Sequence, residues 1–226
     1  MVAVKENLME IQADIEQAAR RAGRNKEDIN IIAVTKYVTI ERAKEALSAG
    51  IVHLGENRNE GFLAKFEEIR DSATWHFIGS LQSRKVKDMI HHIDYIHSLD
   101  RKSLAKEINK RAEKTVPCFV QVNVSGEESK HGLDEGEVES FIKDLAAFEH
   151  IQVAGLMTMA PHVDNPEETR PLFRKLRLLR DRIKGLGLDY APCEYLSMGM
   201  SNDYEIAVEE GATHIRIGTK LVGSEI

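Results

Sequence analysis

The stretch Ile29-Asn-Ile-Ile-Ala-Val-Thr-Lys36 is a run of mostly β-branched and apolar residues that ends in a cation. Such a run predicts a buried β-strand with a lysine at its C-terminal tip. In the alternation of a strand, Ile32, Val34 and Lys36 share one face, so the ammonium group continues an apolar row. A lysine in such a row needs a partner or a covalent role. The C-terminal ends of strands are also where α/β folds hold their functional sites.

The same unit recurs along the whole chain: a β-branched run, a polar turn and then an amphipathic segment. Seven further runs predict strands, and they lie at Ile51–Glu56, Thr74–Leu81, Ile93–Leu99, Val116–Val124, Ile151–Met159, Tyr195–Met200 and Thr213–Thr219. The segments between them have helical periodicity and lie at Thr39–Ala49, Asn57–Arg70, Ser83–His91, Lys102–Lys114, Asp134–Phe148, Glu167–Lys184 and Asp203–Glu210.

Eight strands that alternate with helices predict either an open doubly wound sheet or a closed barrel. We favour a (β/α)8 TIM barrel, because the eighth strand candidate lies a few residues before the last residue and leaves no further strand over. The amphipathic segment Asn7–Ala22 precedes the first strand and predicts an extra N-terminal helix across the bottom or the rim of the barrel. We expect residues 1–226 to form a single barrel domain.

The composition argues against several classes of partner. A net charge of −6, without a strong cluster of lysine and arginine, argues against a nucleic-acid surface. The content of 42% hydrophobic and 30% charged residues is ordinary for a soluble globular protein, and no apolar run approaches the length of a membrane span. The two cysteines, Cys118 and Cys193, match no metal or redox spacing. We therefore expect a cytoplasmic protein.

Two segments near the end of the chain predict a phosphate seat. Ser197-Met-Gly-Met-Ser-Asn-Asp203 runs from a strand tip through a glycine into a helix start, where backbone N–H groups and the Ser201 hydroxyl converge. Arg216-Ile-Gly-Thr219 ends the next strand with a second glycine and hydroxyl. Barrels often seat a phosphate between the loops after strands seven and eight. Glycine and serine also serve ordinary turns, so the two segments alone leave both interpretations open.

Arg216 shares a strand face with His214 and Gly218, which predicts a side chain that points to the barrel interior or mouth. It could form a buried ion pair with an acid such as Glu56, or it could donate to an uncharged acceptor on a ligand. Together with Lys36 and a phosphate seat, the second interpretation suggests pyridoxal 5′-phosphate (PLP), whose aldehyde, phosphate and ring nitrogen need three such partners. A Schiff-base aldolase that acts on a sugar phosphate also combines a barrel lysine with a phosphate seat, and stays open as an alternative.

Seven stretches follow one another along the chain: Ala33-Val-Thr-Lys36, Gly55-Glu-Asn-Arg58, Trp75-His-Phe-Ile-Gly-Ser-Leu-Gln82, Gln121-Val-Asn-Val-Ser-Gly-Glu-Glu-Ser-Lys-His-Gly132, Gly155-Leu-Met-Thr-Met159, Leu196-Ser-Met-Gly-Met-Ser-Asn-Asp203 and Arg216-Ile-Gly-Thr219. In these stretches and in their order, the chain resembles the YggS/PROSC family of PLP-binding homeostasis proteins over essentially its whole length.

The resemblance implies a barrel like the PLP-binding domain of alanine racemase, with Lys36 as the Schiff-base lysine. It also implies that Ser201, Gly218 and Thr219 hold the phosphate, that Arg216 faces the pyridine nitrogen, and that Asn57 lies beside the cofactor. Lys220 departs from the small residue expected after the Gly-Thr pair. We expect its side chain to lie in solvent rather than at the phosphate.

The resemblance and the arginine together favour a carrier over a catalyst. A guanidinium group only donates hydrogen bonds, so it favours an unprotonated pyridine, which is a poorer electron sink than a pyridinium. Alanine racemase compensates with a tyrosine from a separate domain of its partner subunit, and we expect no such domain in a chain that stops at Ile226. The prediction is a PLP-binding protein of PLP homeostasis, without robust catalysis, that could supply apo-PLP enzymes. A low-activity amino-acid racemase, with Tyr37 or His76 as second acid/base, is the alternative.

Overall fold

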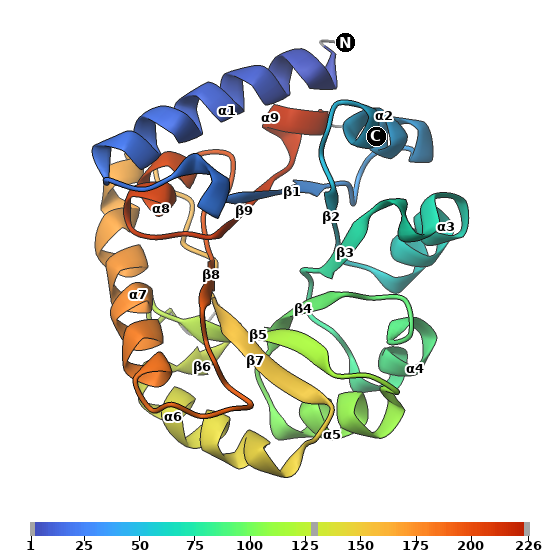
Figure 1. Cartoon of the computed structure of the whole chain (residues 1–226), viewed down its shortest axis with the longest axis vertical. Coiled ribbons are helices and arrows are strands. Elements are labelled where there is room, and N and C mark those ends of the chain that lie inside the picture. The colour runs from blue at the N-terminus through green and yellow to red at the C-terminus, as the bar shows by residue number, and fades with distance from the viewer. Residues whose placement is uncertain (1–2, 128–130, 224–226) are drawn as a thin grey trace.

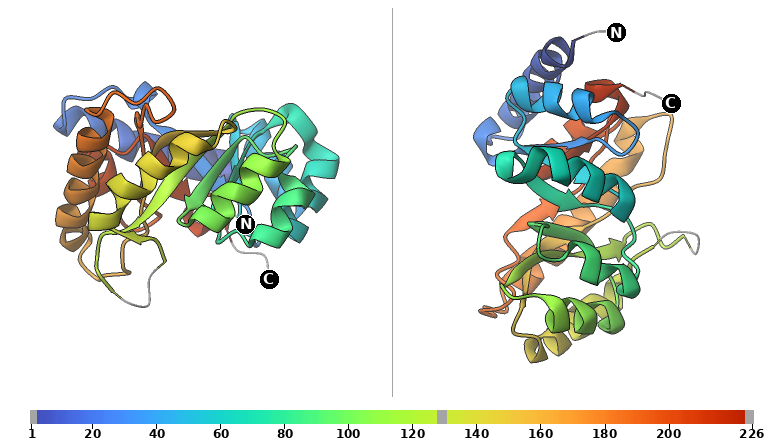
Figure 2. Two further views of the ribbon diagram at one scale, coloured as in Figure 1. Left: turned by 90° about the horizontal axis from the view of Figure 1, so that it is seen from below. Right: turned by 90° about the vertical axis from the view of Figure 1, so that its right-hand side faces the viewer.

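The computed structural model describes residues 3–127 and 131–223. Within these residues, eight parallel strands form a closed barrel in the order β1, β2, β3, β4, β5, β7, β8, β9, and the pairing of β9 with β1 closes the ring. Helices surround the strands (Figure 1), and two side views show the same arrangement (Figure 2). The predicted (β/α)8 barrel is therefore confirmed.

The barrel strands all lie inside the runs predicted from the sequence, and most of them end earlier. They are β1 (Asn30–Val34), β2 (His53–Glu56), β3 (Thr74–Phe77), β4 (Tyr95–Leu99), β5 (Val116–Asn123), β7 (Ile151–Met157), β8 (Tyr195–Ser197) and β9 (His214–Ile217). A short additional strand, β6 (Leu133–Asp134), pairs with the end of β5 outside the ring. The earlier strand ends matter for the site, because they leave several candidate residues on loops.

The helices are α1 (Val4–Arg21), α2 (Ile40–Ser48), α3 (Asn59–Ile69), α4 (Val86–Met89), α5 (Lys102–Arg111), α6 (Glu135–Asp144), α7 (Arg170–Lys184), α8 (Tyr204–Glu209) and α9 (Thr219–Val222). Local capping fixes the start of α6, where Asp134 and Glu137 form a capping box. None of the described helices combines the length and the apolarity that a bilayer crossing requires.

The N-terminal helix exists, but its predicted place was wrong. α1 packs against α8, α9 and α2, and it lies in the outer layer of helices rather than across the bottom of the barrel (Figure 1). The reason is that α9 has only four residues. A helix that short leaves part of the wall beside β9 and β1 uncovered, and the apolar face of α1, which includes Val4, Leu8 and Ile11, is buried there.

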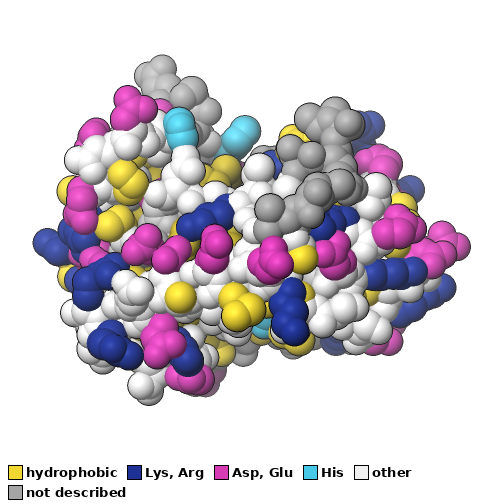
Figure 3. Space-filling model, turned by 90° about the horizontal axis from the view of Figure 1, so that it is seen from above, with side chains coloured by type: hydrophobic (Ala, Val, Ile, Leu, Met, Phe, Trp, Pro, Cys, Tyr) yellow, Lys and Arg dark blue, Asp and Glu magenta, His cyan; other side chains and the backbone are white. Residues whose placement is uncertain are grey.

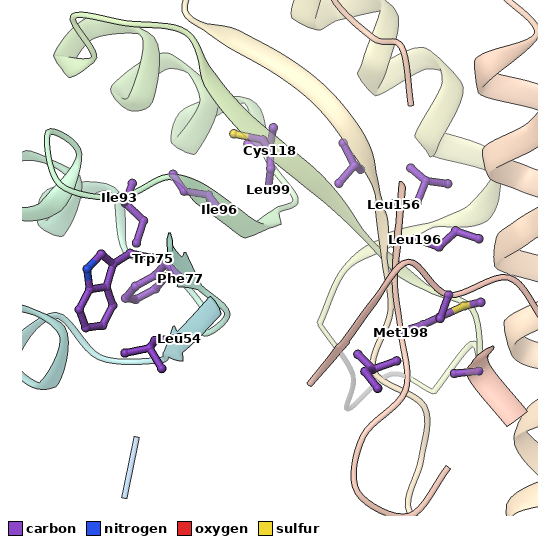
Figure 4. Packing of buried hydrophobic residues seen from close by; sticks show 14 of the residues in the cluster. Leu54, Trp75, Phe77, Ile93, Ile96, Leu99, Cys118, Leu156, Leu196 and Met198 are labelled. Atoms are coloured by element: carbon purple, nitrogen blue, oxygen red, sulfur yellow. The ribbon is translucent and has the colours of Figure 1, made fainter. Parts of the chain in front are cut away.

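The main core lies between the strands and the helices. In β3, alternation puts Trp75 and Phe77 on the side of the helices and His76 inside the barrel. The Trp75 ring contacts Phe62 and Phe66 of α3, at centroid distances of 5.3 and 6.2 Å. Figure 4 shows Trp75 and Phe77 grouped with neighbours from other strands. This layer of large apolar side chains holds the strands in place.

The barrel interior is unusual because rings and polar side chains fill much of it. His76 stacks on Tyr95 at 4.7 Å and His97 stacks on Phe119 at 4.2 Å, measured between ring centroids. His214 touches the same group of rings and is 2% exposed. Branched aliphatic side chains dominate the interiors of most such barrels. This interior therefore has capacity for hydrogen bonds directly beneath the mouth.

Candidate functional site

A cavity of about 450 Å³ opens at the C-terminal ends of the strands. Its lining includes all six residues predicted as a site: Lys36, Asn57, Ser201, Arg216, Gly218 and Thr219. Figure 3 shows the molecule hollowed along its upper edge, with histidine side chains beside the hollow. Residues that are up to 183 positions apart in the sequence thus meet in one pocket.

Lys36 lies two residues beyond the end of β1, in a turn, and its side chain is exposed. The expectation that its ammonium group continues the apolar row of the strand was wrong, because β1 ends at Val34 and the backbone turns before Lys36. Val34 and Lys36 both line the pocket. The Nζ atom of Lys36 lies 4.8 Å from the centre of the Tyr37 ring. The amine is therefore accessible from the cavity to an electrophile.

The loops after β8 and β9 supply hydroxyl and amide donors. Ser201 and Thr219 bring their hydroxyl groups to the pocket lining. Within the part of the chain that the structure describes, the amide N–H groups of Ser201, Asn202 and Thr219 donate to no protein acceptor. Several unused donors around one cavity are what an anion such as a phosphate needs.

Gly199 shapes the first of these loops. Its φ of +91° lies in the left-handed region, and a Cβ atom there would lie 2.5 Å from the Cβ of Ala207. Only glycine fits such a position without strain. The loop then closes on itself, because the Asp203 carboxylate accepts a hydrogen bond of 2.7 Å from the Met200 amide. Burial raises the pKa of Asp203, and Arg216 acts in the opposite direction.

Arg216 is buried beneath the pocket, with 4% of its surface exposed. It donates from one terminal nitrogen to Ser197 Oγ at 2.6 Å and from the other to the Thr158 carbonyl at 2.9 Å. The interpretation of Arg216 as a partner of Glu56 was wrong. Glu56 faces the helices, where it accepts from Lys65 at 3.0 Å and from Thr35 at 2.6 Å. The guanidinium group is therefore a fixed donor at the pocket.

Asn57 packs closely against Gly79, which also lines the pocket. A Cβ atom on Gly79 would lie 2.5 Å from the Asn57 carbonyl oxygen, so the loops after β2 and β3 are in close contact. Lys220 does not line the pocket, and its side chain is partly exposed. It donates to Asp14 at 3.1 Å and to the Tyr204 hydroxyl at 2.6 Å. This agrees with the expectation that Lys220 stays away from a phosphate.

The two residues proposed as a second acid/base differ in position. Tyr37 lines the pocket and is 52% exposed. His76 is fully buried below the pocket and is hydrogen-bonded to His53 at 2.9 Å and to His97 at 2.8 Å. The suggestion of His76 as an acid/base was therefore wrong, and Tyr37 stays a candidate.

Sequence reasoning missed two histidines of the pocket, His131 and His162. Both follow strands, but they lie deep in long loops, and a loop residue gives no periodic signal of its direction. His162 Nδ1 accepts a hydrogen bond of 2.9 Å from the Asn202 side-chain amide. Among the described residues, no group of three or more histidine, cysteine or acidic side chains is arranged to hold a metal ion. Burial raises the pKa of both Cys118 and Cys193 to about 12, so neither is an activated thiol.

Comparisons with known proteins show which family the chain resembles. The family profile described as the N-terminal domain of alanine racemase matches residues 7–225. A pyridoxal phosphate homeostasis protein of Aquifex aeolicus is 43% identical over 223 residues, with 96% of each chain covered. The crystal structure of an unknown protein from Bifidobacterium adolescentis has a TM-score of 0.91 at 32% identity, and the match covers 97% of this chain and 94% of that one. PipY from Synechococcus elongatus, solved with PLP bound, has a TM-score of 0.81 at 33% identity, and the match covers 93% of this chain and 100% of PipY.

Proposed function

The chain belongs to the family of the alanine racemase N-terminal domain and, within it, to the pyridoxal phosphate homeostasis proteins, and on this premise we propose that it binds PLP in the strand-end pocket, as a Schiff base on Lys36. Its role is then to hold PLP for PLP homeostasis in the cytoplasm, as a single barrel domain, without robust catalysis of its own. The observation that carries the proposal is the meeting of an accessible amine, a fixed guanidinium group and unused amide donors in one cavity.

The residues of the pocket fit the three functional groups of PLP. The aldehyde needs an amine, and the accessible amine of Lys36 meets that need. The phosphate needs hydrogen-bond donors, which Ser201, Thr219 and their amide groups provide. The ring nitrogen needs a partner, and Arg216 lies beneath the pocket as a donor. When bound, PLP supplies an electron sink for carbanion chemistry.

Arg216 supports the proposal that the protein is a carrier. Both of its partners in the protein, Ser197 and the Thr158 carbonyl, accept hydrogen bonds from it. A guanidinium group has no lone pair with which to accept a proton or a hydrogen bond. It can therefore stabilise an unprotonated ring nitrogen but not a pyridinium, and this weakens the electron sink. Such a site favours retention of PLP over catalysis with PLP.

The test of binding and catalysis combines a spectrum with an exchange assay. PLP added to the protein should produce a visible absorption band that saturates at one PLP per chain and is absent in Lys36→Ala. Lys220→Ala, a lysine outside the pocket, is the matched control and should keep the band. Exchange of the α-proton of L-amino acids in deuterated water should run no faster than with free PLP. Exchange well above that rate, lost in Lys36→Ala, would establish an enzyme instead.

Delivery to other proteins needs its own measurement. The loaded protein should reactivate an apo-PLP enzyme, with the rate followed as a function of carrier concentration. A rate that rises with carrier concentration, at a constant level of free PLP, indicates direct transfer. A rate that depends on free PLP alone would restrict the role to storage.

One observation favours a second function, a low-activity amino-acid racemase. Tyr37 lines the pocket, and its ring lies 4.8 Å from Lys36 Nζ, so it is placed where a second acid/base could act. Tyr37→Phe should then lower the exchange rate while the visible band remains. A sugar-phosphate aldolase would carry no visible band at all.

A further inference from the structure

A continuous line of hydrogen bonds runs through the barrel interior to Arg216. His53 Nδ1 lies 2.9 Å from His76 Nε2, and His76 Nδ1 lies 2.8 Å from His97 Nε2. His97 Nδ1 then lies 2.8 Å from Ser197 Oγ, which also accepts the 2.6 Å bond from Arg216. The three histidines come from the neighbouring strands β2, β3 and β4, and Ser197 and Arg216 come from the neighbouring strands β8 and β9.

The histidines of this line are uncharged. His76 and His97 have no exposed surface, and desolvation by burial lowers the pKa of each well below the ordinary value. His53 is half-buried, and desolvation lowers its pKa as well. Each ring therefore carries one N–H donor and one lone-pair acceptor. A neutral ring must then donate in one direction and accept in the other.

Arg216 sets the direction of the line. Since its guanidinium group can only donate, Ser197 Oγ must accept from it, and the Ser197 proton is free to go to His97 Nδ1. His97 then carries its own proton on Nε2 and donates to His76, which in turn donates from Nε2 to His53. The opposite direction would leave the buried Ser197 proton without any acceptor among the described residues, which is unfavourable.

Electrostatics favours the same direction. Each ring in this arrangement turns its lone pair toward the Arg216 cation and its N–H away from it. Dipoles aligned in this way strengthen one another in a medium of low dielectric constant. The rings that surround the line, His214, Tyr95 and Phe119, are uncharged, because desolvation lowers the pKa of His214 to about 3 and raises that of Tyr95. A charged group, Asp94, acts on His53 at the end of the line far from Arg216: burial lowers the pKa of that ring, and the Asp94 carboxylate opposes this shift.

We infer that Ser197, His97, His76 and His53 act as positioning residues: a one-way chain of hydrogen bonds, with all three histidines in the Nε2–H form, that fixes the Arg216 guanidinium group at the pocket. The direction of the chain follows from the hydrogen-bond geometry and from the burial of the histidines. The role of the chain, which is to place Arg216 for the ring nitrogen before PLP binds, rests on the proposed function. The pocket then has no need to reorganise Arg216 when PLP binds.

The first test is the tautomer of each histidine in the PLP-free protein. Long-range ¹H–¹⁵N correlation spectra of protein labelled with ¹⁵N-histidine at pH 7.5 should show a protonated Nε2 and a bare Nδ1 for His53, His76 and His97. Nδ1–H forms, or comparable populations of both tautomers, at His76 or His97 would overturn the inference. This measurement needs no variant and no PLP.

The second test breaks the chain at two places and compares both with an interior control. Ser197→Ala and His97→Gln should each weaken PLP binding about tenfold and shift the absorption maximum of bound PLP, because Arg216 loses its fixed position. Ser197→Thr keeps the hydroxyl group and should restore both properties. His214→Gln is the matched control, since His214 is equally buried and contacts the same Phe119 ring but lies outside the chain. It should keep PLP affinity within twofold.

Unchanged affinity and spectrum in both Ser197→Ala and His97→Gln would overturn the positioning role, and so would an equal loss in His214→Gln. Unfolding curves of every variant separate a loss of the fold from a loss of positioning. If wild-type protein bound no PLP, the proposed function would fall while the tautomer pattern still decided the direction of the chain.

Discussion

Lys36 and Arg216 line the same pocket, but they differ in how firmly their side chains are held. Arg216 is buried and donates to two acceptors, so its orientation is set before any ligand binds. Lys36 is exposed in a turn and touches the ring of Tyr37. The contrast suits the proposed roles, because a group that orients a ligand gains from rigidity. A nucleophilic amine gains from access instead.

The phosphate seat can be tested one hydroxyl group at a time. Ser201→Ala and Thr219→Ala should each weaken PLP binding by about 1.5–3 kcal/mol, the usual contribution of a hydrogen bond to a charged group. Pyridoxal, which lacks the phosphate, should bind wild type far more weakly than PLP does. Titrations followed by the visible band measure both effects.

The matched control for the seat is Ser80→Ala, a serine of the same pocket that lies on the loop after β3. Its effect should be smaller than that of either seat variant. Equal affinity for pyridoxal and PLP would mean that the loops after β8 and β9 are ordinary turns.

Secondary structure was the part most open to prediction. The β-branched runs predicted all eight barrel strands, because a buried parallel strand needs apolar residues in sequence. The ends of the strands were harder: at Lys36 the run continues while the backbone already turns. The position of α1 depends on how it packs beside the short helix α9, and a local sequence pattern does not predict such tertiary packing. β6 has two residues, too few for any pattern.

The contact between β2 and α3 yields a prediction about stability. Lys65 and Glu56 form an ion pair whose side chains are 7% and 1% exposed. Lys65→Met should lower the free energy of unfolding by about 3–5 kcal/mol, because it leaves the Glu56 charge buried without its partner. Urea unfolding at pH 7.5 measures the change.

The exposed pair of Lys44 and Glu68 is the control, with an Nζ–Oε2 distance of 3.1 Å. Lys44→Met should change the free energy of unfolding by about 1 kcal/mol or less. Similar decreases in the free energy of unfolding for Lys65→Met and Lys44→Met would contradict the prediction that the buried ion pair is the more costly one to break.

The barrel as a whole brings together what the linear sequence separates. His53, His76, His97 and His214 are far apart in the sequence, and only the closed ring puts them in one interior. Each of them is an inward residue of its strand, so a strand register would have revealed the cluster. Without that register, no spacing in the chain predicts that His97 and Ser197, 100 residues apart, share a hydrogen bond.

This interior should make the whole fold sensitive to acid. Desolvation lowers the pKa of His76, His97 and His214 in the folded protein. Below about pH 6.5 the unfolded chain therefore binds protons that the folded chain does not, and the free energy of unfolding falls as the pH falls. The loss approaches about 1.4 kcal/mol per pH unit for each histidine. Above about pH 7.5 these groups contribute no pH dependence.

Urea unfolding at pH 7.5, 6.0 and 5.0 tests the acid prediction in a range above the titration of most carboxylates. His214→Gln should reduce the slope by about 1.4 kcal/mol per pH unit near pH 5, because one buried imidazole is gone. A free energy of unfolding that stays constant from pH 7.5 to 5.0 would contradict the account of the interior.

The most direct test of the whole proposal is to trap PLP on the protein. Borohydride reduction of the PLP-loaded chain, followed by proteolysis and peptide mass mapping, should place the pyridoxyl group on Lys36 at one per chain. Lys36→Ala should retain no stoichiometric label, although its phosphate seat is intact. A pyridoxyl group found mainly on another lysine, or spread over exposed lysines such as Lys85 and Lys220, would contradict the assignment of Lys36 and with it the proposed function of the pocket.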